Sequence, residues 1–227
     1  MPLSAYRNYQ SLINLVPGAT PARFSNAETD TPARSMTTFV NGQSSYNNGT
    51  RTDGAANVNI WLPNHNMYVS PAETIDSVNV STSNFDAEQG NAGGAAITVV
   101  TKAGTNDLRG SAFEFHNSEK LNASPFYFGG ATTSKPAKVP VSRNIFGGTI
   151  GGPIVKNKTH FFGGYEHTER DLSGGAVITI TPANQALLRL GEPRYQPRGL
   201  NTEFAIGKID HQLNDANRLS LRYIFFD

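Results

Sequence analysis

Residues 79–110, NVSTSNFDAEQGNAGGAAITVVTKAGTNDLRG, hold a sharp change of sequence pattern. Ser83 and Asp86 have the spacing of a capping box, and Gly90 stands where a helix needs a left-handed residue to end. The pattern therefore predicts a short helix, a turn loosened by glycine and then a strand over Ala95–Thr101.

After that strand the pattern changes to an alternation of aromatic and polar side chains. Phe113 and Phe115 fall on one side of an extended segment, and Glu114 falls on the other. Such alternation suggests a barrel wall. It divides the chain into a first region, 1–108, and a second region, 109–227.

Composition limits how this chain could meet a membrane. Only 37% of the residues are hydrophobic, and there are 22 glycines and 13 prolines. The most apolar stretch, residues 95–100, is far shorter than the roughly 18 residues of a spanning helix. A β-barrel remains possible, because its lipid-facing residues alternate with lumen-facing ones and leave a weak hydropathy signal.

Charge and cysteine content exclude several classes. The net charge is +1 and the charges are scattered, so a nucleic acid is an improbable partner. There are no cysteines, which excludes disulfides and thiolate metal sites. The first residues, MPLSAYRNYQ, lack the apolar region of a secretory signal. We therefore expect the natural gene to continue at both ends of this chain.

The first region is predicted to hold two further helices and a loop. Ser4 can cap a helix whose Tyr6, Tyr9, Ile13 and Val16 form an apolar stripe suited to a core.

Ser70 precedes Pro71, Ala72 and Glu73 in the order of a capped helix start. Residues 44–67 are rich in Asn, Gly, Thr and Ser and are expected to form a long surface loop.

The second region is predicted to alternate strands with turns. In residues 218–226, Leu219, Leu221, Tyr223 and Phe225 share one face, while Ser220 and Arg222 share the other. Residues 204–213 are the expected antiparallel partner, joined through the polar turn at 214–217. A short helix is also expected over residues 181–190.

No pattern of catalytic or metal-binding residues stands out. Residues 147–152 are rich in glycine but match no phosphate-binding spacing, so close approach of another segment or a bent strand explains them better. His160 and His167 fall on opposite faces of one strand, and no zinc-binding spacing occurs. The chain is therefore expected to have no catalytic residue, no metal and no cofactor. Phe126, Tyr127 and Phe128 suit an interfacial aromatic girdle better than a sugar platform.

Residues 57–68, NVNIWLPNHNMY, form the segment best suited to contact a ligand. They combine the only tryptophan with amide, imidazole and phenol groups, a mixture that suits a polar organic ligand. The candidate substrate-binding residues are Trp61, Asn64, His65 and Tyr68. An equally weighted alternative is that Trp61 fixes the loop against a barrel wall.

In their order, these segments resemble TonB-dependent outer-membrane receptors, whose plug domain ends in a Gly-Gly-x-Ile-x-Val-x-Thr-Lys strand before the first barrel strand. The matching residues are Gly93, Gly94, Ile97, Val99, Thr101 and Lys102. The phrases NIFGGTIGGPI, KTHFFGGYE and KIDHQLNDANRLSLRY are similar to barrel strands of the large branch that carries a carboxypeptidase-regulatory-like N-terminal domain. PLSAYRNYQSLINLVPG is similar to its early plug helix. Residues 55–69 have no counterpart, and the energy-coupling box and signal peptide are absent.

The resemblance implies an α+β plug (1–108) followed by antiparallel β-strands of an incomplete transmembrane β-barrel (109–227), located in the bacterial outer membrane. It implies a transporter rather than an enzyme, one that binds a scarce solute and imports it by energy-coupled plug rearrangement. The implied partners are the inner-membrane TonB energy-coupling complex, engaged through a missing N-terminal part, a small polar solute or oligosaccharide, and outer-membrane lipid. Alternation suggests Glu114 and Arg222 as polar contacts between plug and barrel.

Two other classes stay open at this stage. A soluble or surface-attached β-rich module that binds carbohydrate or mediates adhesion would have a similar composition, but its strands should close a compact sandwich. A β-fold hydrolase would need a convergent acid/base or metal site, which the sequence does not indicate.

Overall fold

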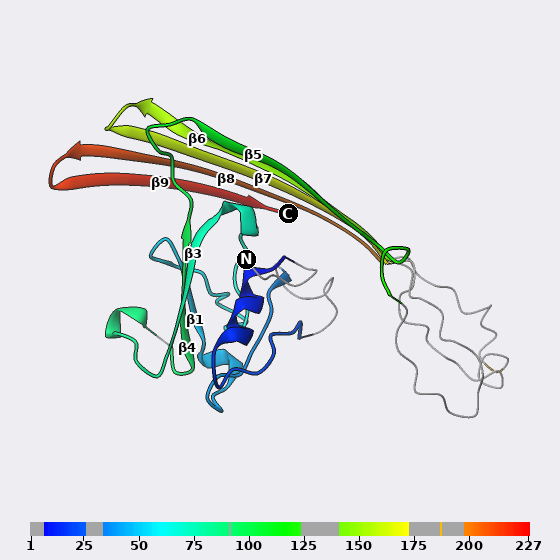
Figure 1. Cartoon of the computed structure of the whole chain (residues 1–227). Coiled ribbons are helices and arrows are strands. Elements are labelled where there is room, and N and C mark those ends of the chain that lie inside the picture. The colour runs from blue at the N-terminus through cyan, green and yellow to red at the C-terminus, as the bar shows by residue number, and fades with distance from the viewer. Residues whose placement is uncertain (1–6, 26–33, 91, 124–140, 173–186, 188–197) are drawn as a thin grey trace. The chain divides into compact units, whose positions relative to one another are not determined.

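The computed structural model describes residues 7–25, 34–90, 92–123, 141–172, 187 and 198–227 (Figure 1). The chain divides into two compact units. The first consists of Met1–Ser111, Gly148–Glu166 and Phe204–Asp227, and the second of Ala112–Gly147 and His167–Glu203. The predicted helix at 181–190 and the aromatic residues Phe126, Tyr127 and Phe128 lie outside the described residues.

A four-stranded mixed sheet organises the first part of the chain. Its strands are β1 (Gly49–Thr52), β2 (Ala55–Ala56), β3 (Ile75–Thr82) and β4 (Ala95–Thr101), in the order β2-β1-β4-β3. β4 pairs parallel with β1 and antiparallel with β3 (Figure 1). The predicted strand at Ala95–Thr101 is confirmed, and it lies between two neighbours.

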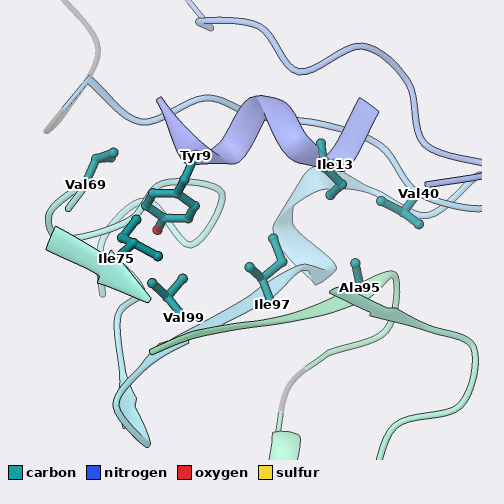
Figure 2. Packing of buried hydrophobic residues seen from close by; sticks show 8 residues of the cluster. All are labelled: Tyr9, Ile13, Val40, Val69, Ile75, Ala95, Ile97 and Val99. Carbon is teal, nitrogen blue, oxygen red and sulfur yellow. The ribbon is translucent and has the colours of Figure 1, made fainter. Parts of the chain in front are cut away.

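One apolar core covers a face of this sheet. The 3-10 helix η1 (Tyr9–Leu15) lies over β4 and contributes two side chains to the core (Figure 2). The buried cluster consists of Tyr9, Ile13, Val40, Val69, Ile75, Ala95, Ile97 and Val99. Tyr9 and Ile13 therefore belong to a core, as their spacing predicted.

The predicted helices are shorter and tighter than expected. Between residues 7 and 123, leaving aside positions 26–33 and 91, every helical segment is a 3-10 turn, so the α part of the expected α+β plug is not seen there. η1 is capped by Asn8, whose side chain accepts a hydrogen bond from the Gln10 N–H. The predicted cap Ser4 and the stripe residue Tyr6 lie outside the described residues.

The two other helix starts also need correction. η5 (Ala72–Thr74) is a single turn with Pro71 at its N-cap, and Ser70 makes no cap hydrogen bond. η6 (Ala87–Gln89) begins after Asp86, while Ser83 accepts a hydrogen bond from Asn41 Nδ2. Strands begin or end too close to these segments for a longer helix to form. Gly90 ends η6 with a positive φ of 70°, as predicted, but its ψ of −135° is not that of the left-handed helical conformation.

The expected surface loop at 44–67 is wrong in large part. The segment contains η4 (Ser45–Asn47), β1 and β2, and several of its polar side chains are buried. Asn57 is fully buried; its amide nitrogen donates to Thr52 Oγ1 at 3.2 Å, and its amide oxygen accepts from the Met67 N–H at 3.1 Å. The polar composition suggested a loop, but asparagine side chains here bond to backbone groups and so hold the segment in a fixed conformation without long helices or strands.

A five-stranded sheet follows, with its strands in sequence order: β5 (Arg109–Ser118), β6 (Ser142–Val155), β7 (Thr159–Leu172), β8 (Arg198–Asn214) and β9 (Asn217–Phe226). β8 and β9 form the predicted antiparallel hairpin, with Phe204 opposite Phe226 and Asn214 opposite Asn217. β5 and β9 are its two edges, so the described strands do not close a barrel.

The two faces of β9 differ in part as predicted, because Ser220 is exposed although it shares the face of Arg222. Leu219, Leu221, Tyr223 and Phe225 are exposed, whereas Arg222 is largely covered. On the covered side, Phe162, Phe204 and Ile206 form a small apolar cluster against which Tyr68, Ile224 and Phe226 pack. Large apolar side chains are exposed along the other strands too, at Phe146, Ile150 and Ile154 of β6, Tyr165 of β7, and Ile209 and Leu213 of β8.

Among the described residues, no helix combines the length and the apolar character that crossing a membrane would require.

Candidate functional site: an ionic contact around Asp53

Asp53 occupies the tight turn between β1 and β2. Its φ is 49° and that of Gly54 is 84°, a left-handed pair that Asp and Gly tolerate better than most residues. The Asp53 N–H donates to the Val99 carbonyl at 2.9 Å. Thr101 donates from its backbone N–H to Asp53 Oδ1 at 2.7 Å and from its hydroxyl to Oδ2. The end of β4 therefore fixes the direction of the Asp53 carboxylate.

Two cations from the β8–β9 hairpin meet this carboxylate. Arg222 Nη1 lies 2.6 Å from Asp53 Oδ2 and also donates to the Thr52 carbonyl at 2.9 Å. Lys208 Nζ lies 3.7 Å from the same carboxylate oxygen and 3.5 Å from Thr101 Oγ1. Lys208 and Arg222 stand directly opposite each other in the ladder, so their side chains reach the same face of the hairpin. Residues from the first and last parts of the chain thus share one site.

The charges at this site favour the ionised carboxylate. Burial alone would raise the pKa of Asp53, but the hydrogen bonds from Thr101 and Arg222, together with the charge of Lys208, outweigh burial and lower the pKa below its ordinary value of 3.8. A lowered pKa means that the contact contributes its full stability above about pH 4–5 and loses it as pH falls through the folded-state pKa. At neutral pH the ion pair is fully formed.

A second polar cluster lies within the same unit. Arg7 pairs with Glu73. Arg7 also lines a small cavity, together with Arg34, Ser70 and the buried Glu166 of β7. These charges again come from the first part of the chain and from a strand of the second sheet. Tyr68 adds an apolar contact, with its ring centroid 6.5 Å from that of Phe204.

The four predicted ligand-contact residues do not point to one place. Trp61 is 90% exposed, so it does not fix its loop against a described strand. His65 is buried, Asn64 is partly covered and Tyr68 packs on Phe204. Asn59 accepts hydrogen bonds from the N–H groups of Trp61 and Leu62, which holds the tip of the loop in a fixed turn.

The loop carries a titratable group at its base. Burial lowers the pKa of His65, and a hydrogen bond with the backbone of Ser35 offsets part of that effect. His65 Nε2 lies 3.5 Å from Ser25 Oγ. Below the loop, Asn66 donates from its side chain to the hydroxyl of Tyr9 at 2.8 Å. The segment is therefore anchored in the core at one end and presents Trp61 to solvent at the other.

The two predicted plug–barrel residues differ in their surroundings. Arg222 contacts Thr52 and Asp53, as described above. Glu114 is exposed on β5 and, within the described ranges, makes no hydrogen bond or ion pair. The roles of Asp53, Lys208 and Thr101 at this contact were not predicted from the sequence. The available signals were the Asp-Gly turn and the even spacing that places residues 208 and 222 on the covered faces of their strands.

Two histidines form hydrogen bonds between neighbouring strands of the five-stranded sheet. His116 Nδ1 lies 2.6 Å from Asn144 Oδ1, and His211 Nδ1 lies 2.8 Å from Thr159 Oγ1. Across the part of the chain that the structure describes, no three His, Cys, Asp or Glu residues gather in a way that could hold a metal ion.

Three comparisons relate the sequence and the fold of this chain to known proteins. A family model described as an outer membrane beta barrel domain matches residues 100–192. The TonB-dependent transporter Oar of Myxococcus xanthus is 27% identical over 239 residues, covering 95% of this chain and 20% of that protein. The outer membrane transporter YddB from Escherichia coli has a similar fold, with a TM-score of 0.65 and 13% identity over 96% of this chain and 30% of that one.

These similarities support a TonB-dependent receptor-like protein of the outer membrane, in agreement with the resemblance in the sequence. The chain spans only 20% of the length of the curated relative that it matches.

Proposed function

We propose that this chain supplies the plug and the first barrel strands of a solute transporter, and that the Asp53 contact holds the two together until transport. Residues 1–108 act as the plug and residues 109–227 as barrel wall. The observation that carries the proposal is the ion pair between Asp53 and Arg222, which are 169 positions apart in the sequence. The name of the relative, a TonB-dependent transporter, supports the role.

In this proposal, the work of the protein is conformational and no bond is broken. An inner-membrane TonB energy-coupling complex pulls on a segment that precedes this chain, and the plug leaves the wall. The Asp53 contact resists the pull, because its charges are mostly covered. Breaking a buried pair on one side costs about 3–5 kcal/mol, and less where part of each side chain stays wet. Here the side chains are 16% and 18% exposed.

The exposed face of β6 to β9 is proposed to meet outer-membrane lipid. Apolar side chains such as Ile150, Ile209 and Leu221 are exposed on it. Glu114 is proposed as a further polar contact with a part of the plug. Trp61, with Asn64, His65 and Tyr68 behind it, is proposed to touch a small polar solute or oligosaccharide; the fixed turn at Asn59 supports this role, because a rigid aromatic group loses little entropy on binding.

A comparison of two arginines on one strand tests the proposal. Arg222 and Arg218 lie on the same face of β9, but Arg218 pairs with Asp210 of β8, at 3.0 Å, rather than with the plug region. In the full-length protein in planar bilayers, Arg222→Gln should increase the frequency of open-channel conductance, because the plug is held less firmly. Arg218→Gln should leave that conductance near the wild-type level.

The two variants also define the result that would contradict the proposal. Equal conductance in both, with equal protease resistance of the barrel, would mean that the Asp53 contact does not hold a plug. Trp61→Ala serves as a separate control. It should leave the conductance unchanged and weaken the uptake of labelled oligosaccharide, if the solute contact is correct.

A further inference from the structure

The segment between the two sheets, residues 102–108, lies unusually close to the backbone of β6 and β7. A Cβ atom added at Gly104 would lie 2.2 Å from the Phe161 carbonyl oxygen and 2.8 Å from that of Gly152. Both distances are below any that a real Cβ atom adopts. Only glycine fits here, because the obstacle on both sides is main chain rather than a flexible side chain.

Two glycines of β6, Gly151 and Gly152, leave room for the connecting segment to approach this strand closely. A Cβ at Gly152 would meet the side chain of Leu108 at 2.9 Å, and one at Gly151 would lie 3.5 Å from the Cα of Gly104. Gly151 and Gly152 belong to the glycine-rich run singled out in the sequence. The run thus forms a shallow notch in β6 that receives the connecting segment.

A side chain fastens the segment at the same place. Asn106 donates from Nδ2 to Asn157 Oδ1 at 2.5 Å, and its Oδ1 accepts the Asn157 N–H at 2.7 Å. His160 Nε2 lies 2.9 Å from that same Asn106 oxygen. Asn157 sits in the turn between β6 and β7 with φ 61°, so its amide group is held in place by the turn.

Between Lys102 and Gly104, the connecting segment passes from contacts with the first sheet to contacts with β6 and β7. The Lys102 N–H donates to the Thr74 carbonyl at 2.9 Å, which ties it to the four-stranded sheet side. Gly104 and Asn106 are tied to β6 and β7 instead. The backbone between these two attachments, at Ala103, is therefore the place where the two parts can separate.

We infer that residues 104–108 form a fixed clamp on the barrel wall, built from the Gly104 notch and the Asn106–Asn157 pair, and that plug movement stops at Ala103. This inference rests on the proposed function, since it assumes that a plug moves. It assigns the glycine run and Asn106 a role in limiting how much of the chain TonB-driven force can release. The wall and the last five residues before β5 then behave as one body.

Single-molecule pulling on the full-length protein in a lipid bilayer, from its N-terminal side, tests the inference. The chain has no cysteine of its own, so cysteine pairs can be joined in it by a short bismaleimide. In one variant the pair is Asn106→Cys with Asn157→Cys; in the other it is Asp53→Cys with Arg222→Cys. Any cysteines elsewhere in the full-length protein are replaced first.

The two cross-links should have different effects on the length of chain that pulling unfolds before the barrel strands resist the force. The 106–157 link should leave the length unchanged, because those residues do not separate. The 53–222 link should shorten it by about 50 residues, or ~175 Å at about 3.5 Å per extended residue. A shortening by the 106–157 link would overturn the clamp.

Point variants give an independent readout of the same clamp. Asn106→Ala should remove the final force peak before the barrel strands leave the bilayer. Thr105→Ala, which loses only the two hydrogen bonds of its hydroxyl with the Asp107 backbone within the segment, should keep it. If pulling on the wild type extracts residues 104–108 and then β5 without a pause, the clamp is wrong, although the release of the plug is still observed. If no plug release precedes strand extraction, the proposed function fails, and the stop at Ala103 fails with it.

Discussion

The four-stranded sheet β2-β1-β4-β3 and the five-stranded sheet β5 to β9 treat their large apolar side chains differently. The first buries them in its core, whereas the second exposes many of them and covers several charged groups. In β4, Ala95, Ile97 and Val99 are buried under η1. In β9, the large apolar residues Leu221 and Tyr223 are exposed, and the covered side chain between them is Arg222.

This difference teaches what surrounds each sheet. The first sheet hides its apolar face inside its own core, as a domain in water must. The second leaves a row of apolar side chains along four strands without protein cover, far more than isolated surface residues would explain. A lipid environment accounts for such a face, since lipid accepts apolar groups and rejects charge. A charged residue in place of an apolar one should therefore be most damaging at covered positions of the first sheet and at exposed positions of the second.

The largest effect is expected in the first sheet. Val99 is 0% exposed and its neighbour Val100 is 39% exposed, so the two give a matched pair on one strand. Val99→Asp places an unpaired carboxylate in the core and should lower the free energy of unfolding of the first sheet and its core by at least about 3–5 kcal/mol. Val100→Asp should cost less than about 1 kcal/mol. Amide hydrogen exchange of β3 and β4 in the full-length protein measures both; equal protection in the two variants would show that the core assignment is wrong.

A smaller effect is expected in the second sheet, with the faces exchanged. Leu221→Arg in the full-length protein should cost about 2–4 kcal/mol near the middle of the bilayer, because the cation then faces lipid. Ser220→Arg should be milder, since Ser220 shares the face of Arg222 and lies opposite Asp210. Refolding into bilayers, followed by the urea midpoint of each variant, compares them. Similar damage from both would mean that both faces are buried in protein, and a sandwich would replace the barrel.

The smallest effect is expected at His65, which lies at the polar base of the Trp61 loop and not in the apolar core. Because burial lowers the pKa of His65 below 6.5, the neutral ring stabilises the loop fully above that pH, and the stability falls as pH drops through the folded-state pKa. Exchange of the Met67 and Tyr68 amides, both bonded to Asn57, should quicken on acidification towards pH 5 after correction for the intrinsic rate. His65→Gln should flatten this response. A pH-independent rate in the wild type would argue against a neutral buried histidine.

Strands were predicted better than helices, and the reason is local. The alternation of Leu219, Leu221 and Tyr223 with polar residues reflects the two sides of the strand, which the strand carries in its own sequence. The cap signals at Ser70 and Ser83 were local as well, but a helix needs several turns to repay its nucleation. β3 begins at Ile75, so the helix after Ser70 could only be one turn.

Of the two partners in the Asp53–Arg222 ion pair, only Arg222 could be predicted from the sequence. Alternation was enough to place Arg222 on the covered face of β9. The partner could not be read in the same way, because the Asp53 contact depends on how a turn in the first sheet meets a hairpin at the other end of the chain. The notch at Gly151 and Gly152 is similar: the glycines indicated a close approach, but Gly104 was not identifiable as the residue that enters it.

The place of β4 in its sheet has a consequence for the order of assembly. β4 is the last of the four strands in sequence, yet it lies between β1 and β3 and is the strand that holds both. The parallel pairing of residues 49–52 with residues 96–99 must therefore wait until the end of this segment has arrived. Pairings of such long sequence separation form slowly, because the closure entropy of the loop is lost before the contacts are gained. During export, β1 and β3 would emerge as unpaired edges, and a chaperone that shields them until β4 follows would be most useful in that interval.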